Sequence, residues 1–170
     1  MSNRKRTFIL VVFIIVLLAL PTTVLANKQL FKARLTTGAE LHEVVGSQAR
    51  GAMNLAMFPD GVMRFQMQVV GLSGPATGAH LHAPADESSN APVILTLCGN
   101  PAPSAIGGVC PFDVATKSMT VSGEIDSNLL YAWGLRPADL FAWLDGGLVY
   151  VNVHTALNPM GEVRGQLLRP

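Results

Sequence analysis

The chain has 170 residues, of which 49% are apolar and 14% are charged, and its formal net charge is +1. This length corresponds to one ordinary domain and excludes two large ones. Twelve basic residues against 11 acidic ones leave no charge excess of the kind that nucleic-acid-binding proteins carry, so we expect no nucleic-acid partner.

The first 26 residues have the composition of a signal peptide. Three basic residues within the first six positions precede the uncharged apolar run Phe8 to Leu20, and the segment ends in Val24-Leu25-Ala26. A transmembrane helix needs about 20 apolar residues, whereas a shorter apolar run before a small-residue cleavage site is typical of a secretion signal. We therefore predict cleavage after Ala26 and export to the periplasm or the extracellular space. Contact with a membrane is expected only if this segment stays uncleaved.

Residues 27–170 then form the mature domain, with nine basic and 11 acidic residues. A domain of this size buries about 68 to 70% of the surface of its unfolded chain, so it can fold without cross-links. Cys98 and Cys110 enclose a segment rich in Gly and Pro, and an oxidising compartment lets them pair. We predict one disulfide. The absence of a Cys-x-x-Cys motif from the sequence argues against a zinc or redox role for these cysteines.

Alternation of apolar and polar residues dominates the mature domain and predicts β-strands. Apolar and polar residues alternate from Val62 to Val70 and in the preceding segment 52–58, and the turn Pro59-Asp60-Gly61 separates the two. The predicted strands are 30–36, 52–58, 62–70, 78–83, 93–98, 118–125, 148–155 and 162–168.

One segment has helical spacing instead. Arg136 to Leu144 has Pro and Asp in its first turn and apolar residues three to four positions apart, and two glycines follow it. Many short strands with Gly and Pro turns and a single helix predict an all-β fold, an antiparallel β-sandwich or barrel.

Three of the four histidines are predicted to share one face of the sheet, directed away from the core and exposed to solvent. His80 and His82 are two positions apart in a predicted strand, so both imidazoles leave on the same face. His154 shares a strand face with Tyr150 and Asn152, opposite three valines. If the two strands adjoin, the three imidazoles form a candidate site for copper or zinc, which both accept nitrogen ligands.

Alternatives to this metal site stay open. A His-x-His pair on a polar strand face is also typical of hydrogen-bonded histidines without a metal. His42 lies far away in sequence and is the first candidate for a fourth ligand.

A polar cluster is expected beside the histidines. The turn Asn158-Pro159-Met160-Gly161 leads into a returning strand on which Glu162 and Arg164 lie beside Tyr150 and Asn152. Glu162 is a candidate acceptor that orients a histidine, and Arg164 is a candidate partner for Glu162 or for an anion. A purely structural ion pair across the hairpin is the alternative.

No catalytic residue and no organic cofactor is expected. The sequence contains no Gly-x-Ser-x-Gly elbow and no phosphate-binding glycine pattern, and neither cysteine adjoins a histidine.

Four motifs together resemble the CHRD domain, a family named after chordin, over roughly residues 30–168. They are Phe31-x-Ala33-x-Leu35, the segment 78–84, the segment 150–155 and the segment 158–166. The resemblance implies a secreted, immunoglobulin-like β-sandwich with limited similarity to copper/zinc superoxide dismutases. A dismutase of that kind needs more histidines than this chain has, so dismutase activity is not expected.

Two hypotheses follow from the sequence. The first is a non-enzymatic exported module, binding or structural, that acts on an unidentified protein or envelope partner. The second is a copper- or zinc-binding protein that uses His80, His82 and His154.

Overall fold

The computed structural model describes residues 27–170, and the predicted signal peptide, residues 1–26, lies outside this part. All eight predicted strands are confirmed, with small shifts at their ends. They are β1 (Gln29–Thr36), β2 (Arg50–Met57), β3 (Met63–Val70), β4 (Ala76–His82), β5 (Val93–Gly99), β6 (Ser118–Ile125), β7 (Tyr150–Thr155) and β8 (Val163–Gln166). In residues 27–170 we find no helix with the length and apolar composition needed to cross a membrane.

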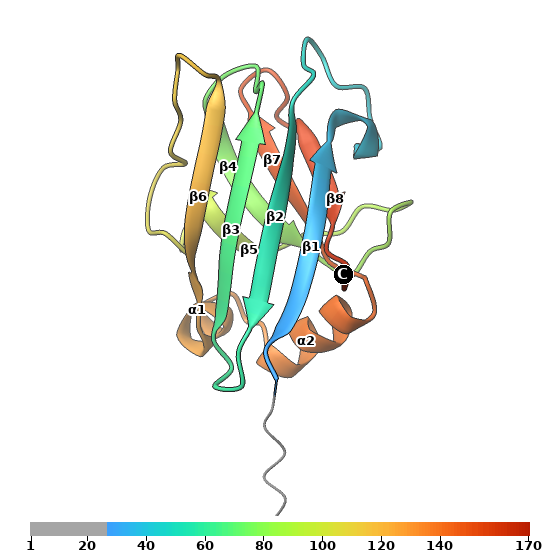
Figure 1. Ribbon diagram of the computed structural model, residues 1–170, viewed down its shortest axis with the longest axis vertical. Helices are drawn as coiled ribbons and strands as arrows, with labels where there is room; N and C mark the ends of the chain where they lie inside the picture. The colour runs from blue at the N-terminus through green and yellow to red at the C-terminus, as the bar shows by residue number, and fades with distance from the viewer. Residues whose placement is uncertain (1–26) are drawn as a thin grey trace, which may run out of the picture.

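The strands form one antiparallel sheet in the order β5-β4-β7-β8-β1-β2-β3-β6. Figure 1 shows β3, β2 and β1 in front of β5, β4 and β7, so the sheet folds back on itself and is nearly closed. The two layers expected of a sandwich are joined where β8 meets β1, through the pair Thr36 and Arg164 and through two backbone hydrogen bonds between Lys32 and Leu168.

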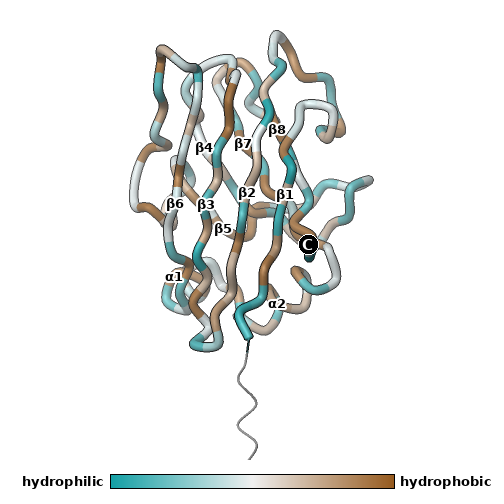
Figure 2. The backbone as a smooth tube through the Cα atoms, in the orientation of Figure 1, coloured by the Kyte–Doolittle hydropathy of each residue, from teal (hydrophilic) through white to brown (hydrophobic). Residues whose placement is uncertain are grey.

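Residues that alternate along each strand fill the space between the two layers. On β3, the apolar residues at positions 63, 65, 67 and 69 are buried, while Arg64, Gln66 and Gln68 are exposed. Figure 2 shows this alternation of apolar and polar residues along the strands. Since every second side chain of a strand faces the same way, a single two-residue pattern places one set in the core and the other in solvent.

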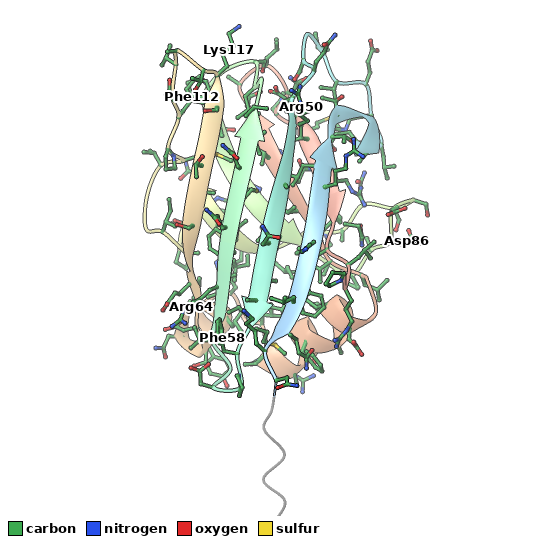
Figure 3. All side chains as sticks on the ribbon, in the orientation of Figure 1. Arg50, Phe58, Arg64, Asp86, Phe112 and Lys117 are labelled. Atoms are coloured by element: carbon green, nitrogen blue, oxygen red, sulfur yellow. A yellow bond between two sulfur atoms is a disulfide. The ribbon has the colours of Figure 1, made fainter. Side chains whose placement is uncertain are left out.

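The turn between β2 and β3 has the predicted chemistry. Gly61 adopts a φ of 84°, and the carboxylate of Asp60 accepts a hydrogen bond of 3.0 Å from the backbone N–H of Val62. Figure 3 labels Phe58 and Arg64 at this end of the molecule, where the guanidinium lies 4.7 Å from the ring centroid of Phe58.

The predicted helix is confirmed as α2 (Pro137–Asp145), but the prediction of a single helix was wrong. A second helix, α1 (Ser127–Ala132), follows β6, and a short 3-10 helix follows β1. The carboxylate of Asp126 accepts a 2.8 Å hydrogen bond from the backbone N–H of Leu129 and so caps α1. Asp126, three positions before Leu129, is a helix-start signal in the sequence. The alternation of apolar and polar residues in β6, which comes just before it, obscured this signal.

The predicted disulfide joins Cys98 to Cys110 and closes the loop after β5. In the chain-entropy description, closing a loop of this length stabilises the fold by about 3 kcal/mol. We therefore expect the Cys98→Ala, Cys110→Ala double variant to unfold in urea with a free energy about 3 kcal/mol lower than that of the oxidised protein. Addition of a reductant should produce a similar loss in the wild type and none in the variant. If the reductant also lowered the free energy of unfolding of the double variant, it would be acting on a group other than this disulfide.

Candidate metal centre

The structure brings His80, His82 and His154 together. β4 pairs with β7 so that Gly78 lies opposite His154 and His80 lies opposite Asn152. Each histidine offers one ring nitrogen, and these three atoms lie within 4.8 Å of one another. The ring centroids of His80 and His154 are 4.8 Å apart, and that of His82 lies 5.9 and 6.1 Å from the other two.

One ring nitrogen of each histidine is held by a backbone carbonyl. For His80, His82 and His154 the acceptors are the carbonyl oxygens of Asn100, Ala91 and Pro159, at 2.6, 2.9 and 3.0 Å. A carbonyl oxygen can only accept, so each of these ring nitrogens donates its proton. In a neutral imidazole the opposite nitrogen then carries a free lone pair, which fixes the tautomer of all three rings.

Within residues 27–170, the three lone-pair nitrogens have no hydrogen-bond partner. They are Nδ1 of His80, Nε2 of His82 and Nε2 of His154, and all three are shielded from solvent. Buried polar atoms without a partner are costly and uncommon. Metal-bound histidines typically donate their second N–H to a carbonyl, and these three rings have that arrangement before any ion binds.

The histidines point away from the core, as predicted, but the expectation that they lie on a solvent-exposed surface was wrong. His80 and His82 are each only 7% exposed, because the loops that carry Ala91, Asn100 and Pro159 cover this face. Burial is the main cause that lowers the pKa of His82 and of His154 to about 4, and it also lowers the pKa of His80. The imidazoles are therefore neutral at pH 7 and need lose no proton to bind a metal ion.

Tyr150 and Arg164 form a stack against His82. The rings of Tyr150 and His82 are parallel within 5°, with centroids 4.7 Å apart, and the guanidinium of Arg164 lies 3.6 Å from the centroid of Tyr150. The Tyr150 hydroxyl donates to the carbonyl of Ala91, the same oxygen that holds His82. The ring of Tyr150 thus separates a buried cation from one of the candidate ligands.

Arg164 does not pair with Glu162, so the predicted ion pair was wrong; no salt bridge joins them within residues 27–170. Its guanidinium instead anchors the loop 84–92, through the acceptors Asn90 Oδ1, Asp86 O and Ser89 O at 3.0, 2.8 and 2.8 Å. This loop also carries Ala91, so Arg164 helps to hold the carbonyl that orients His82.

Glu162 orients no histidine through a hydrogen bond in the described part of the chain, which corrects the second role predicted for it. Its carboxylate is fully buried and accepts five hydrogen bonds. The donors are the hydroxyl of Ser47, the backbone N–H and the hydroxyl of Ser73, the hydroxyl of Thr155 and the amide of Asn158. Burial raises the pKa of Glu162, but the hydrogen bonds from Ser47, Ser73 and Thr155 outweigh it and leave the pKa below its usual value. Glu162 is therefore a structural anion that ties three loops to β7.

Glu40 and His42 flank the site on the loop after β1. Asn152 donates a long hydrogen bond of 3.5 Å to Glu40. His42 donates from Nε2 to the carbonyl of Gly161 at 3.0 Å and is not one of the three converging histidines, so it does not supply the fourth ligand. No sequence pattern indicated Glu40, because this residue lies in a segment without periodicity.

Burial raises the pKa of Glu40 to about 7, although Arg164 and the hydrogen bond from Asn152 oppose this rise. A raised pKa in the folded state means that the unfolded chain loses the proton more readily, so Glu40 costs stability as the pH rises from 4.5 through 7. We expect Glu40→Gln to raise the free energy of unfolding by about 3 kcal/mol at pH 8 and to leave it unchanged at pH 4. Urea unfolding at both pH values measures this difference, and an equal effect at both would contradict a titrating Glu40.

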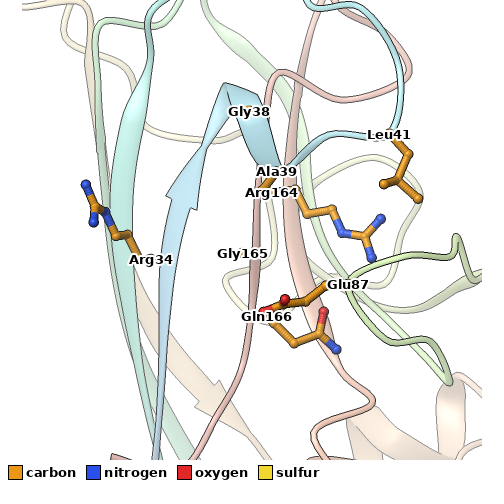
Figure 4. A pocket seen from close by; sticks show the side chains of 8 residues that line it. All are labelled: Arg34, Gly38, Ala39, Leu41, Glu87, Arg164, Gly165 and Gln166. Carbon is orange, nitrogen blue, oxygen red and sulfur yellow. The ribbon is translucent and has the colours of Figure 1, made fainter.

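A cavity of about 310 Å³ lies beside Arg164 (Figure 4). It is lined by Arg34, Gly38, Ala39, Leu41, Glu87, Arg164, Gly165 and Gln166. None of the three histidines lines this cavity, so it is separate from the candidate metal centre.

The model of the CHRD domain family matches residues 31–167, which agrees with the motifs at 78–84, 150–155 and 158–166. No curated protein and no solved structure matches the chain.

Proposed function

The chain belongs to the CHRD domain family, and from this premise we propose that it is a non-enzymatic, exported binding module whose ligand is one copper or zinc ion held by His80, His82 and His154. The observation that carries the proposal is that each of the three histidines offers a ring nitrogen within 4.8 Å of those of the other two, and that each has a buried ring nitrogen without a hydrogen-bond partner in residues 27–170. Export follows the composition of residues 1–26. An immunoglobulin-like arrangement with limited similarity to copper/zinc superoxide dismutases remains part of this proposal.

The chemistry of the donor set supports copper or zinc over harder ions. Imidazole nitrogen suits copper and zinc, whereas calcium and magnesium require oxygen ligands. Two nitrogens that each bind one ion at about 2.0 Å are no more than about 4 Å apart, so ring nitrogens that lie within 4.8 Å of one another must move by roughly 1 Å to bind a common ion. The backbone carbonyls behind each ring hold it in the tautomer that coordination requires.

A titration of metal-free residues 27–170 with copper and with zinc tests the proposal. We expect one ion per chain, and a loss of affinity of about 100-fold or more in His82→Ala, because two ligands alone bind weakly. His42→Ala is the matched control, since His42 is the one histidine outside the cluster, and it should bind like the wild type. Wild-type affinity no higher than that of a variant with all three histidines replaced would overturn the proposal.

A further inference from the structure

The candidate metal centre contains no negatively charged ligand. Within residues 27–170, the three histidines form the only group of potential ligands that converges in this way, and no carboxylate or thiolate joins them. From this we infer that the site prefers monovalent copper to divalent zinc or copper, and that Arg164 contributes to the preference. The inference rests on the proposed function and names the oxidation state of its ligand.

The charge of the ion is the first argument. The cost of burying an ion grows with the square of its charge, so a divalent ion costs about four times as much as a monovalent one. Anionic ligands normally offset this cost. Here the three histidine ligands are neutral, so none of them compensates the second positive charge of a divalent ion.

The number of ligands is the second argument. All three lone-pair nitrogens are shielded from solvent, and His42, the fourth histidine, is bonded to the carbonyl of Gly161. Zinc in proteins takes four ligands, and where the protein offers three the fourth is water or substrate, which here would have to reach nitrogens that are shielded from solvent. Divalent copper favours a tetragonal set. Monovalent copper has a filled d shell and is stable with three ligands, which is the number this site offers.

Arg164 supplies the third argument. It is 2% exposed, and its guanidinium is separated from His82 by one aromatic ring. A positive charge in a buried environment disfavours a divalent ion nearby more than a monovalent one.

The acids on this face do not reverse that effect. Glu40 interacts with Arg164, but burial raises the pKa of this carboxyl to about 7, so near neutral pH its partial negative charge offsets only part of the guanidinium's charge. The carboxylate of Glu162 is enclosed by its five donors. Asp86 lies on a protruding loop (Figure 3), where its carboxylate accepts hydrogen bonds from Ser88 and Ser89.

Competition experiments on residues 27–170 with the disulfide intact test the preference. Under anaerobic conditions, monovalent copper is titrated against a chromogenic copper(I) chelator, and zinc is titrated against a zinc-binding dye. We expect the copper(I) affinity to exceed the zinc affinity by about 1,000-fold. Equal or tighter zinc binding would overturn this inference and leave the proposed function intact, whereas binding of neither ion would end both.

The role of Arg164 is tested by two substitutions that differ in charge. Arg164→Met removes the charge, and we expect the ratio of copper(I) to copper(II) affinity to fall about tenfold, which lowers the reduction potential by about 59 mV. Arg164→Lys keeps the charge but loses the geometry of the hydrogen bonds to the loop, so its ratio should stay close to that of the wild type. If Arg164 acted only by holding the loop, Lys would change the ratio as much as Met, and the electrostatic role would be rejected. If the Met variant fails to fold, Arg164→Gln removes the charge in its place, and an unchanged ratio in that variant would reject the electrostatic role.

Discussion

Replacing Glu162 with alanine is expected to lower the free energy of unfolding by about 4 kcal/mol, measured by urea denaturation at pH 7. The carboxylate accepts from donors in three separate loops, at Ser47, at Ser73 and at Asn158. Its removal leaves several buried donors without a partner, and each such donor costs about 1 to 3 kcal/mol unless it can turn to water. The serine and threonine hydroxyls can rotate towards other acceptors, which recovers part of the lost free energy.

Two substitutions serve as comparisons for Glu162→Ala. Glu162→Gln keeps the shape and one carbonyl acceptor, so its loss should be about half as large. Glu124→Ala removes an exposed acid whose ion pair with Arg64 lies in solvent, and it should cost less than about 1 kcal/mol. If Glu162→Ala were no more destabilising than Glu124→Ala, the hydrogen-bonded centre at Glu162 would not hold the loops together.

Removal of the Glu162 carboxylate should also affect the candidate metal centre. Asn158 and Pro159 belong to the same turn, and the carbonyl of Pro159 holds His154. A Glu162 variant that remains folded is therefore expected to bind copper more weakly, although Glu162 contacts none of the three histidines through a hydrogen bond in residues 27–170.

The strands could be predicted from the sequence because their signal is local. On β3, for example, four alternating apolar residues suffice to define the buried face, and no knowledge of the partner strands is needed. The same parity placed His80, His82 and His154 on one face. Their convergence then needed only that β4 and β7 be neighbours, as the register shows.

The covering loops could not be predicted, because they are held by contacts between residues far apart in the chain. Arg164 and Asp86, whose carbonyl it binds in the loop 84–92, are 78 positions apart, and Asn158, next to Pro159, binds the carbonyl of Val45, 113 positions away. No periodic pattern in either loop indicates these pairs. The burial of the histidines depends on these loops, so their solvent exposure was mispredicted while their position on the sheet was right.

This burial predicts that the metal-free protein loses stability in acid. The pKa of His82 and of His154 is about 4 in the folded protein, against 6.5 for an ordinary histidine. The unfolded chain therefore binds protons first, and the stability that is complete above pH 6.5 is lost as the pH falls towards 4. Each histidine should account for about 3 kcal/mol of this loss, and mutual repulsion of the protonated rings couples the two.

Urea unfolding of the Glu40→Gln protein at pH 7 and pH 4.5 isolates the histidines, because Glu40 titrates in the opposite sense over the same range. In that background His82→Asn should remove about half of the pH dependence and the His82→Asn, His154→Asn double variant most of it. Saturating metal should steepen the pH dependence of the free energy of unfolding in the Glu40→Gln protein but not in its histidine variants. The reason is that protons and the ion compete for the same nitrogens, and the ion stabilises only the folded state. A double variant with an unchanged pH dependence would show that the acid sensitivity does not arise from His82 and His154.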